Sequence, residues 1–200
     1  MKSPVMIIIF VMGERDGWIH SGIMMRSIQA IQAAQRPLAF HFSDNVRPFD
    51  FACNKAIEEC LRTEAEWFCL IDNDTVPPEN FLSALDEGEH AGYKIIGLPT
   101  PVYRGKGKKV WNSINFLHTR PLAPKMLAAW PGGGVRFIHR SVFEKIERPW
   151  FEYKINPLTR EWEMSEDTML SKKAVDAGIK VGVHGGFPCN HFHTVDLAKI

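Results

Sequence analysis

The stretch WFCLIDNDTVPP, residues 67–78, carries the clearest structural signal in the chain. Its first five residues are apolar, and Asp72 and Asp74 follow directly. A short apolar run without polar alternation is typical of a strand that is buried on both faces of a parallel sheet. In open α/β sheets, ligands bind beyond the carboxyl ends of such strands. The stretch therefore predicts a buried strand with a polar site at its end.

Patterns of strand and helix alternate along the rest of the chain. Apolar runs predict strands at 4–12, 37–42, 67–71, 94–98, 112–117, 132–139 and 180–184. Apolar spacing and boundary residues predict helices at 20–35, 50–62, 77–91 and 165–177, and a short helix at the capping-box pattern of residues 141–144. Residues 99–110 are expected to form a loop. This order predicts an α/β fold with a mainly parallel sheet, helices on both faces and a single domain over residues 1–200.

The composition is that of an ordinary globular protein. The 200 residues are 45% hydrophobic, 24% charged and 11% aromatic, which excludes global disorder. A net charge of +1 argues against the broad basic surface of a nucleic-acid-binding protein, so no nucleic-acid partner is expected. The longest apolar run, residues 4–12, is too short to span a bilayer, and no small-residue cleavage site follows it. The four cysteines form no CxxC pair, so we expect reduced, buried thiols and a cytoplasmic protein.

Asp72 and Asp74 flank Asn73 at the end of the predicted buried strand. Two carboxylates this close raise each other's pKa unless a cation neutralises them. Oxygen ligands at this spacing suit a divalent ion such as Mg²⁺ or Mn²⁺, which completes its coordination with substrate phosphates. The alternative is a polar loop in which one of the two aspartates caps the next helix.

Two further groups of polar residues lie in the second half of the chain. Glu166 and Asp167 fall in the first turn of a predicted helix, where acidic residues either stabilise the helix dipole or serve as a general base. His191 and His193 are two residues apart, so they point the same way on an extended segment. An imidazole from this pair can complete a carboxylate-bound metal site, or both rings are ordinary surface or core residues.

A glycine-rich segment precedes the predicted strand at 132–139. Its three glycines, with Gly133 in the middle, let backbone N–H groups approach the oxygens of a ligand, or they simply form a turn. The chain contains neither G-x-x-x-x-G-K-[ST] nor G-x-G-x-x-G, so P-loop and dinucleotide-binding functions have no support.

Taken together, these patterns resemble the GT-A fold glycosyltransferases, and most closely the short family-two-like members of bacteria and phages. The resemblance runs from about Val5 to His193, and no single motif carries it. Its pieces occur in the family's order: FACNKAIEEC (51–60), WFCLIDNDTVPPENFLSAL (67–85), GGGVRFIHRSVFEKI (132–146), PWFEY (149–153), SEDTMLSKKAVDAGIKV (165–181) and CNHFH (189–193).

The resemblance implies a GT-A-like fold and a nucleotide-sugar donor, with a UDP-sugar favoured, held by Mn²⁺ or Mg²⁺. It implies transfer with inversion to the hydroxyl of a carbohydrate or another acceptor. Asp74 would then ligate the metal, and Asp72 would bind the metal or the donor ribose. His191 matches the family's third ligand, with His193 as the alternative, and Asn73 lies between the two aspartates on the donor side.

The same resemblance implies that Asp167 is the catalytic base, with Glu166 beside it, and that Gly133 contacts the donor. Many relatives carry Arg-Asn in the helix before the acidic motif, where this chain has Cys53 and Asn54. Arg47 or the basic residues within 104–109 would therefore supply the phosphate contact. The chain is short for this fold, so another chain or a homo-oligomer would complete the acceptor site.

Two other function classes remain open from the sequence. The segment from Asp72 to Val76 also fits the D-x-D-x-[TV] nucleophile motif of haloacid-dehalogenase-like phosphatases. That motif normally follows the first strand, whereas at least two predicted strands precede it here. The second alternative is a nucleotide-sugar-binding module without catalytic turnover.

Overall fold

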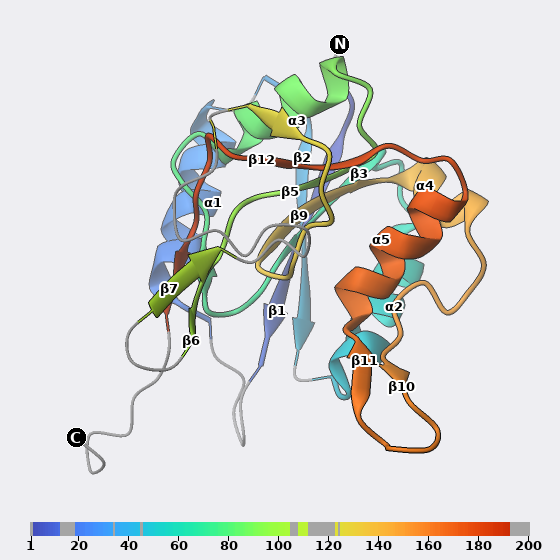
Figure 1. The fold of residues 1–200 in the computed structure, drawn as a ribbon. Coiled ribbons are helices and arrows are strands. Elements are labelled where there is room, and N and C mark those ends of the chain that lie inside the picture. Colours follow the sequence, from blue (N-terminus) through green and yellow to red (C-terminus); the bar gives the residue numbers. More distant parts are fainter. Residues whose placement is uncertain are drawn as a thin grey trace.

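A seven-stranded mixed sheet forms the centre of the protein in the computed structural model, with strand order β2-β1-β3-β9-β5-β12-β8 (Figure 1). The structure describes residues 2–12, 19–33, 35–44, 46–104, 108–111, 123 and 125–192. The strands of the sheet are β1 (Val5–Val11), β2 (Leu38–Asp44), β3 (Trp67–Ile71), β5 (Ile95–Gly97), β8 (Met126–Leu127), β9 (Val135–His139) and β12 (Val181–His184).

Strand directions place several loops at one edge of this sheet. β1 runs parallel to β2 and β3, and β5 runs parallel to β12. β9 lies antiparallel between β3 and β5, so it begins at the edge where its neighbours end. The loop that leaves β3 and the glycine-rich segment that precedes β9 therefore meet at the same edge.

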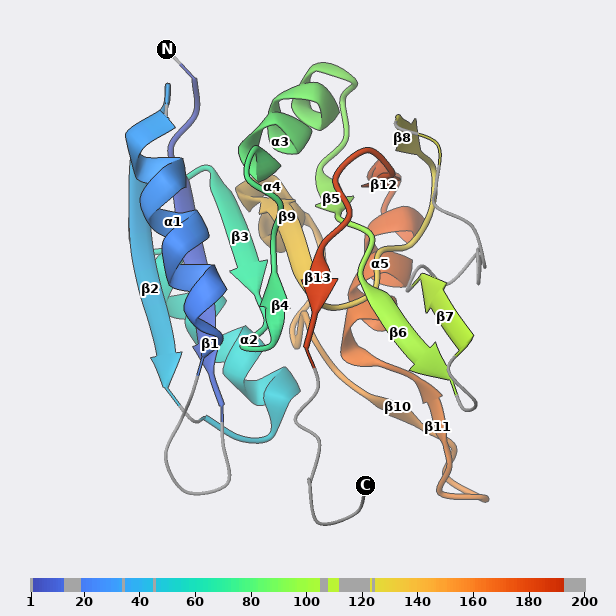
Figure 2. The same ribbon diagram turned by 90° about the vertical axis from the view of Figure 1, so that its left-hand side faces the viewer.

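Helices cover both faces of the sheet (Figures 1 and 2). α1 (Ser21–Ala33) and α3 (Phe81–His90) pack on one face, and α2 (Phe49–Cys60), α4 (Arg140–Lys145) and α5 (Glu166–Asp176) pack on the other. Alternate side chains of β1 enter the two cores, with Ile7 and Ile9 on the α1 side and Ile8 and Phe10 on the α2 side. Burial of each such side chain stabilises the fold by roughly 1.5–3 kcal/mol, which explains why β1 has no polar alternation.

In the described part of the chain, three short strand pairs lie outside the central sheet (Figure 2). These pairs are β4 (Thr75–Val76) with β13 (Asn190–His191), β6 (Pro101–Arg104) with β7 (Lys108–Trp111), and β10 (Lys154–Ile155) with β11 (Trp162–Met164). The β4–β13 pair is the most important for the site, because it joins the end of the chain to the acidic segment after β3.

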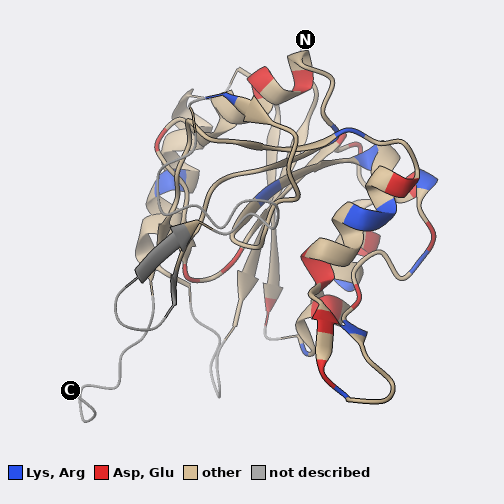
Figure 3. Ribbon diagram, viewed as in Figure 1, with Lys and Arg blue, Asp and Glu red and all other residues tan. Residues whose placement is uncertain are grey.

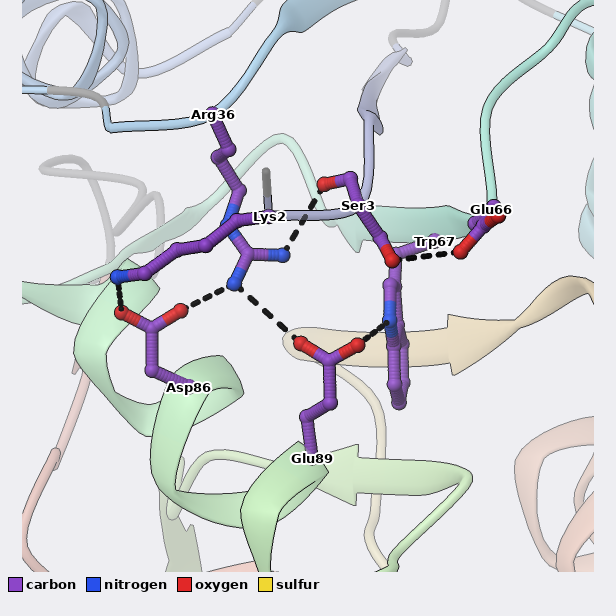
Figure 4. A network of polar contacts seen from close by, with 7 residues as sticks. All are labelled: Lys2, Ser3, Arg36, Glu66, Trp67, Asp86 and Glu89. Carbon is purple, nitrogen blue, oxygen red and sulfur yellow. Dashed lines mark hydrogen bonds and ion pairs between the residues drawn. The ribbon is translucent and has the colours of Figure 1, made fainter.

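A polar network closes the opposite end of the sheet (Figure 4). The buried Arg36 guanidinium donates to the Ser3 carbonyl at 3.2 Å and is ion-paired with Asp86 and with Glu89, the latter at 3.4 Å. Glu89 also accepts a hydrogen bond from the Trp67 indole at 3.1 Å. Trp67 begins β3, whereas Asp72 follows the other end of the same strand. The network therefore lies far from Asp72, and it links the segment before β1 to α3.

Most predicted elements are confirmed, and three details differ. The helix predicted from residue 77 begins at Phe81, after both prolines, because Pro77 and Pro78 lie in the segment that leaves β4. Residues 99–110, predicted as a loop, contain β6 and most of β7. The helix predicted at 141–144 is capped by His139, whose Nδ1 accepts from the Ser141 N–H at 3.2 Å. The predicted mainly parallel sheet is confirmed, with β9 and β8 running antiparallel to their neighbours.

Other expectations are confirmed or lie outside the described residues. All four cysteines are buried and free. No helix in the described part of the chain has the length and hydrophobicity needed to cross a bilayer. The strand predicted at 112–117 lies outside the described residues.

Candidate functional site

Asp72 is fixed in place by Gly134 at the edge where β3 ends and β9 begins. The Asp72 N–H donates to the Gly134 carbonyl at 2.9 Å, and the Gly134 N–H donates to Asp72 Oδ2 at 2.8 Å. Gly134 has φ of 104°, and a Cβ there would lie 2.3 Å from Thr100 Oγ1. Glycine is therefore required at this position both by its backbone conformation and by the lack of space.

The second carboxylate oxygen of Asp72 lies in a buried environment that disfavours charge. Asp72 Oδ1 is buried and has no hydrogen-bond partner among the described residues. Burial is the main reason that the pKa of Asp72 is raised to about 7, and the charges of Asp74 and Glu166 add to this effect. Arg136 and the Gly134 N–H oppose it. Asp72 therefore binds a proton more readily than an exposed aspartate does.

Asp74 and His191, two predicted site residues, are in direct contact. β13 pairs antiparallel with β4, which sets His191 opposite Thr75, and His191 Nε2 lies 3.1 Å from Asp74 Oδ2. His191 Nδ1 lies 2.8 Å from the Pro101 carbonyl oxygen, which can only accept, so Nδ1 carries a proton. The hydrogen bond to Asp74 raises the pKa of His191. Burial works to raise the pKa of Asp74, but the hydrogen bond and charge of His191 outweigh it and hold that pKa below its usual value.

Gly133 brings the acidic turn at 72–74 together with the start of α5. A Cβ added at Gly133 would lie 3.0 Å from Asp72 Oδ2 and 3.9 Å from Asp167 Oδ2. The carboxylates of Asp72 and Asp167 therefore face one point over this glycine, although they are far apart in the sequence. Any side chain at residue 133 would occupy the space between them.

Glu166 and Asp167, the acidic pair, are both buried at the start of α5, at 6% exposure each. Acidic residues mark this end of the helix in Figure 3. Asp167 Oδ1 accepts hydrogen bonds from the Thr168 N–H at 2.7 Å and from the Ser165 hydroxyl, so Oδ2 is the oxygen directed toward Gly133. Burial raises the pKa of Glu166, Asp167 adds to the shift, and the Tyr153 hydroxyl bonds to the Glu166 carboxylate. The acidic pair therefore occupies the first turn of α5, and Asp167 also borders the candidate site at Gly133.

Asn73, one of the predicted donor-side residues, is held by hydrogen bonds to the backbone of neighbouring segments. Asn73 donates from Nδ2 to the Met12 carbonyl at 3.1 Å, and its own carbonyl accepts from the His20 N–H at 2.8 Å. Asn73 therefore ties the acidic turn to the end of β1 and to the segment before α1. Arg47 is exposed in the turn between β2 and α2. His193, residues 105–107 and the side chains of Arg104, Lys108 and Lys109 lie outside the described part of the structure.

Sequence reasoning missed the most unusual side chain near the site, which is Arg136. It lies in β9 at 1% exposure, with the nearest Glu166 oxygen 4.0 Å from Nη2. The signal in the sequence that could have identified it is an arginine among the apolar residues Val135, Phe137 and Ile138. Tyr153 was also missed, and no local pattern distinguishes it from a core aromatic residue.

The donor set at Asp74 and His191 fits a divalent ion. Among the described residues, no three His, Cys, Asp or Glu side chains are grouped as a complete metal site. However, the Pro101 carbonyl fixes the imidazole so that Nε2 faces Asp74, which is the arrangement found for metal-binding histidines. Asp74 and His191 would hold the ion, and the unpartnered Oδ1 of Asp72 is a further oxygen donor at the same edge.

Comparison with known proteins identifies the fold. No protein-family model and no curated protein sequence matches the chain. The crystal structure of A197 from STIV matches with a TM-score of 0.66 and 14% identity, over 95% of this chain and 86% of that one. S. aureus TarS 1–349 in complex with UDP-GlcNAc matches with a TM-score of 0.56 and 10% identity over all of this chain, which spans 61% of the TarS chain. At these identities the likeness concerns the fold: fold neighbours include glycosyltransferases, and the chain has a GT-A-like fold.

Proposed function

We propose that this protein is a metal-dependent glycosyltransferase that moves a sugar from a nucleotide-sugar donor to an acceptor hydroxyl, with inversion at the sugar carbon. The observation that carries the proposal is the convergence of Asp72 and Asp167 over Gly133, beside the Asp74–His191 pair. The likeness to TarS, which binds UDP-GlcNAc, supports a UDP-sugar as the donor.

Asp74 and His191 are proposed to hold the metal ion on the donor side. When bound, a Mn²⁺ or Mg²⁺ ion would stabilise the negative charge of the departing diphosphate. Asp72 contributes Oδ1 to this ion or to the donor ribose, while its Oδ2 stays bound to the Gly134 N–H. Gly133 leaves room for the donor between the two carboxylates.

Asp167 is proposed as the general base on the acceptor side. Its Oδ2 takes the proton of the acceptor hydroxyl while the acceptor oxygen bonds to the sugar carbon and the bond from that carbon to the diphosphate breaks. The Thr168 N–H and the Ser165 hydroxyl hold Oδ1 and so orient Oδ2. Glu166, bonded to Tyr153, borders the acceptor side.

The phosphatase alternative requires Asp72 to act as an ionised nucleophile. Its Oδ2 is already bound by the Gly134 N–H at 2.8 Å, so this oxygen is held in the backbone of the turn rather than free to attack a phosphate. Both β1 and β2 precede β3 in the chain, whereas that motif normally follows the first strand. A binding module without turnover remains the second alternative and is distinguished by experiment.

The test combines donor binding with turnover. Purified protein is incubated with a panel of UDP-, GDP- and dTDP-sugars and Mn²⁺, and release of the nucleoside diphosphate is measured with and without carbohydrate acceptors. We expect release with at least one donor, lost in Asp74→Asn and retained in the exposed control Asp176→Asn. Donor binding without any release would favour the binding module, and phosphate release from simple phosphomonoesters would favour the phosphatase.

A further inference from the structure

We propose that Arg136 is a positioning residue that acts as the shared counter-ion of the donor and acceptor halves of the site and competes with the divalent ion for Asp72. The proposal rests on the proposed function for the identity of the two halves. The role of Arg136 itself is tested below without reference to sugar transfer.

The position of Arg136 places its charge between the two halves. It is the second residue of β9, paired with Leu70 of β3 on one side and with Gly97 of β5 on the other. Its guanidinium lies 5.6 Å from the centre of the Phe151 ring and 4.0 Å from Glu166. It interacts electrostatically with three carboxylates, which are Asp167, Glu166 and Asp72. Asp72 belongs to the donor half, and the acidic pair belongs to the acceptor half.

The hydrogen-bond pattern of Arg136 is not that of a structural arginine. Buried arginines usually close a two-pronged pair with one carboxylate. Here Nε, Nη1 and Nη2 are all buried with no hydrogen-bond partner in the described part of the chain, and Asp72 Oδ1 is likewise without one. No hydrogen bond among the described residues therefore holds the guanidinium to a single acid, although it is ion-paired with Glu166 at 4.0 Å. It stabilises all three through space.

The three carboxylates depend on the charge of Arg136 as their shared counter-ion. Burial works to lower the pKa of Arg136, but Asp167, Glu166 and Asp72 outweigh burial and keep the guanidinium protonated. Without it, three carboxylates would share a buried region, and each would raise the pKa of the others. Arg136 thus allows Asp167 on the acceptor side and Asp72 on the donor side to be ionised at the same time, before any donor is bound.

The same charge opposes a second cation. A divalent ion at Asp72 and Asp74 would lie near the fixed guanidinium, and two cations in a buried region repel each other strongly. Arg136 should therefore weaken the binding of a divalent ion to the empty protein. A bound diphosphate adds negative charge and relieves this repulsion, so metal and donor should bind together more tightly than either alone.

The first test measures Mn²⁺ affinity by calorimetry in wild type, Arg136→Met and Arg136→Lys. Removing the charge should tighten Mn²⁺ binding about 10-fold or more, whereas Arg136→Lys, which keeps the charge, should stay within about 3-fold of wild type. A merely structural arginine predicts the opposite, because disruption of the site weakens binding. Weaker Mn²⁺ binding in a folded Arg136→Met would overturn the proposal.

The second test needs no metal and covers the case in which Arg136→Met folds poorly. Urea midpoints are measured for Arg136→Met in the wild-type background and in the Asp72→Asn, Glu166→Gln background. We expect a large loss of midpoint in the first and a clearly smaller loss in the second, because two of the three acids that need the counter-ion are gone and only Asp167 remains. Equal losses in both backgrounds would overturn the proposal. If wild type binds no Mn²⁺, the metal part of the proposed function fails, and this cycle still decides the role of Arg136.

Discussion

His191 Nε2 lies 3.1 Å from Asp74 Oδ2, although 117 residues separate the two side chains in the sequence. The contact exists because β13 returns from the far end of the chain to pair with β4, directly after the acidic turn. The Pro101 carbonyl binds Nδ1, so a proton or a metal ion must lie between Nε2 and the carboxylate. The metal-free protein uses a proton, and the result is a partly buried ion pair.

The Asp74–His191 pair predicts a defined pH dependence of stability in EDTA. The pKa of His191 is raised in the folded state, so its contribution is complete below about pH 6.5, the usual histidine pKa, and is lost as the pH rises through the raised value. The pKa of Asp74 is lowered, so its contribution is complete above about pH 4 and is lost as the pH falls through the lowered value. Both contributions are complete at pH 5.

His191→Ala should therefore lower the free energy of unfolding more at pH 5 than at pH 9, by about 1 kcal/mol, since the pair is only partly buried. Urea unfolding at both pH values measures this difference. His90→Asn, an exposed histidine at the end of α3, is the control and should show no such difference. The same cost of His191→Ala at both values would contradict the ion pair.

We expect substitutions of Asp167 and Glu166 to reduce transfer activity to different extents. Asp167→Asn keeps the shape of the side chain but removes the proposed base, so transfer should fall by about 10²–10⁴ while donor affinity stays within a few-fold. Glu166→Gln should have a milder effect, because Glu166 faces Tyr153 and Arg136. Steady-state kinetics with separate binding measurements checks both. Near-normal transfer in Asp167→Asn with an inactive Glu166→Gln would move the base to Glu166.

We expect Gly133→Ala to reduce transfer activity much more than it reduces the stability of the fold. A methyl group there would approach Asp72 Oδ2 to 3.0 Å and displace a carboxylate that Gly134 holds in place. Transfer should fall by about 10- to 100-fold in Gly133→Ala, with little change in the urea midpoint. Gly178→Ala is the matched control: it has φ of 72° and open space around it, so it should cost stability and leave transfer intact. An active Gly133→Ala would show that residue 133 lies outside the site.

Asn54 links α2 to the backbone of Trp150 and Phe151, so its loss should lower the stability of the protein. Its Oδ1 accepts from the Trp150 N–H at 2.9 Å and the Phe151 N–H at 3.2 Å, and its Nδ2 donates to the Phe151 carbonyl at 2.7 Å. Asn54→Ala leaves these backbone groups without partners and should destabilise the protein by about 2–4 kcal/mol. The exposed neighbour Lys55→Ala should cost little, and both are compared by urea unfolding. A cost below that of Lys55→Ala would mean that water replaces the amide.

The first half of the fold was predictable because its signals are local. The apolar runs of β1 and β3 mark strands that are buried on both faces, and the acidic turn follows from its place after β3. The acidic pair was predictable in position, because acidic residues at a helix start are visible in the sequence. Its meeting with Asp72 over Gly133 was expected only from the family resemblance.

The remaining features depend on contacts between distant segments. The direction of β9 is not encoded in the residues of the strand, and it is this direction that sets Gly133 beside Asp72. The N-cap of α4 is His139 rather than the expected Ser141, and its Nδ1 accepts from the Ser141 N–H. Arg136 has three acidic neighbours from two separate segments, so its role appears only in the folded protein.

We propose that Asp74 and His191 bind a nucleoside diphosphate through a divalent ion. The most direct measurement is calorimetric titration of the protein with UDP, GDP and dTDP, in Mn²⁺ and then in EDTA, for wild type, Asp74→Asn and the control Asp176→Asn. We predict binding of at least one nucleotide in Mn²⁺ to wild type and to Asp176→Asn, and at least a roughly 10-fold loss of affinity in EDTA and in Asp74→Asn. Equal affinity in Mn²⁺ and EDTA, or an unaffected Asp74→Asn, would contradict it.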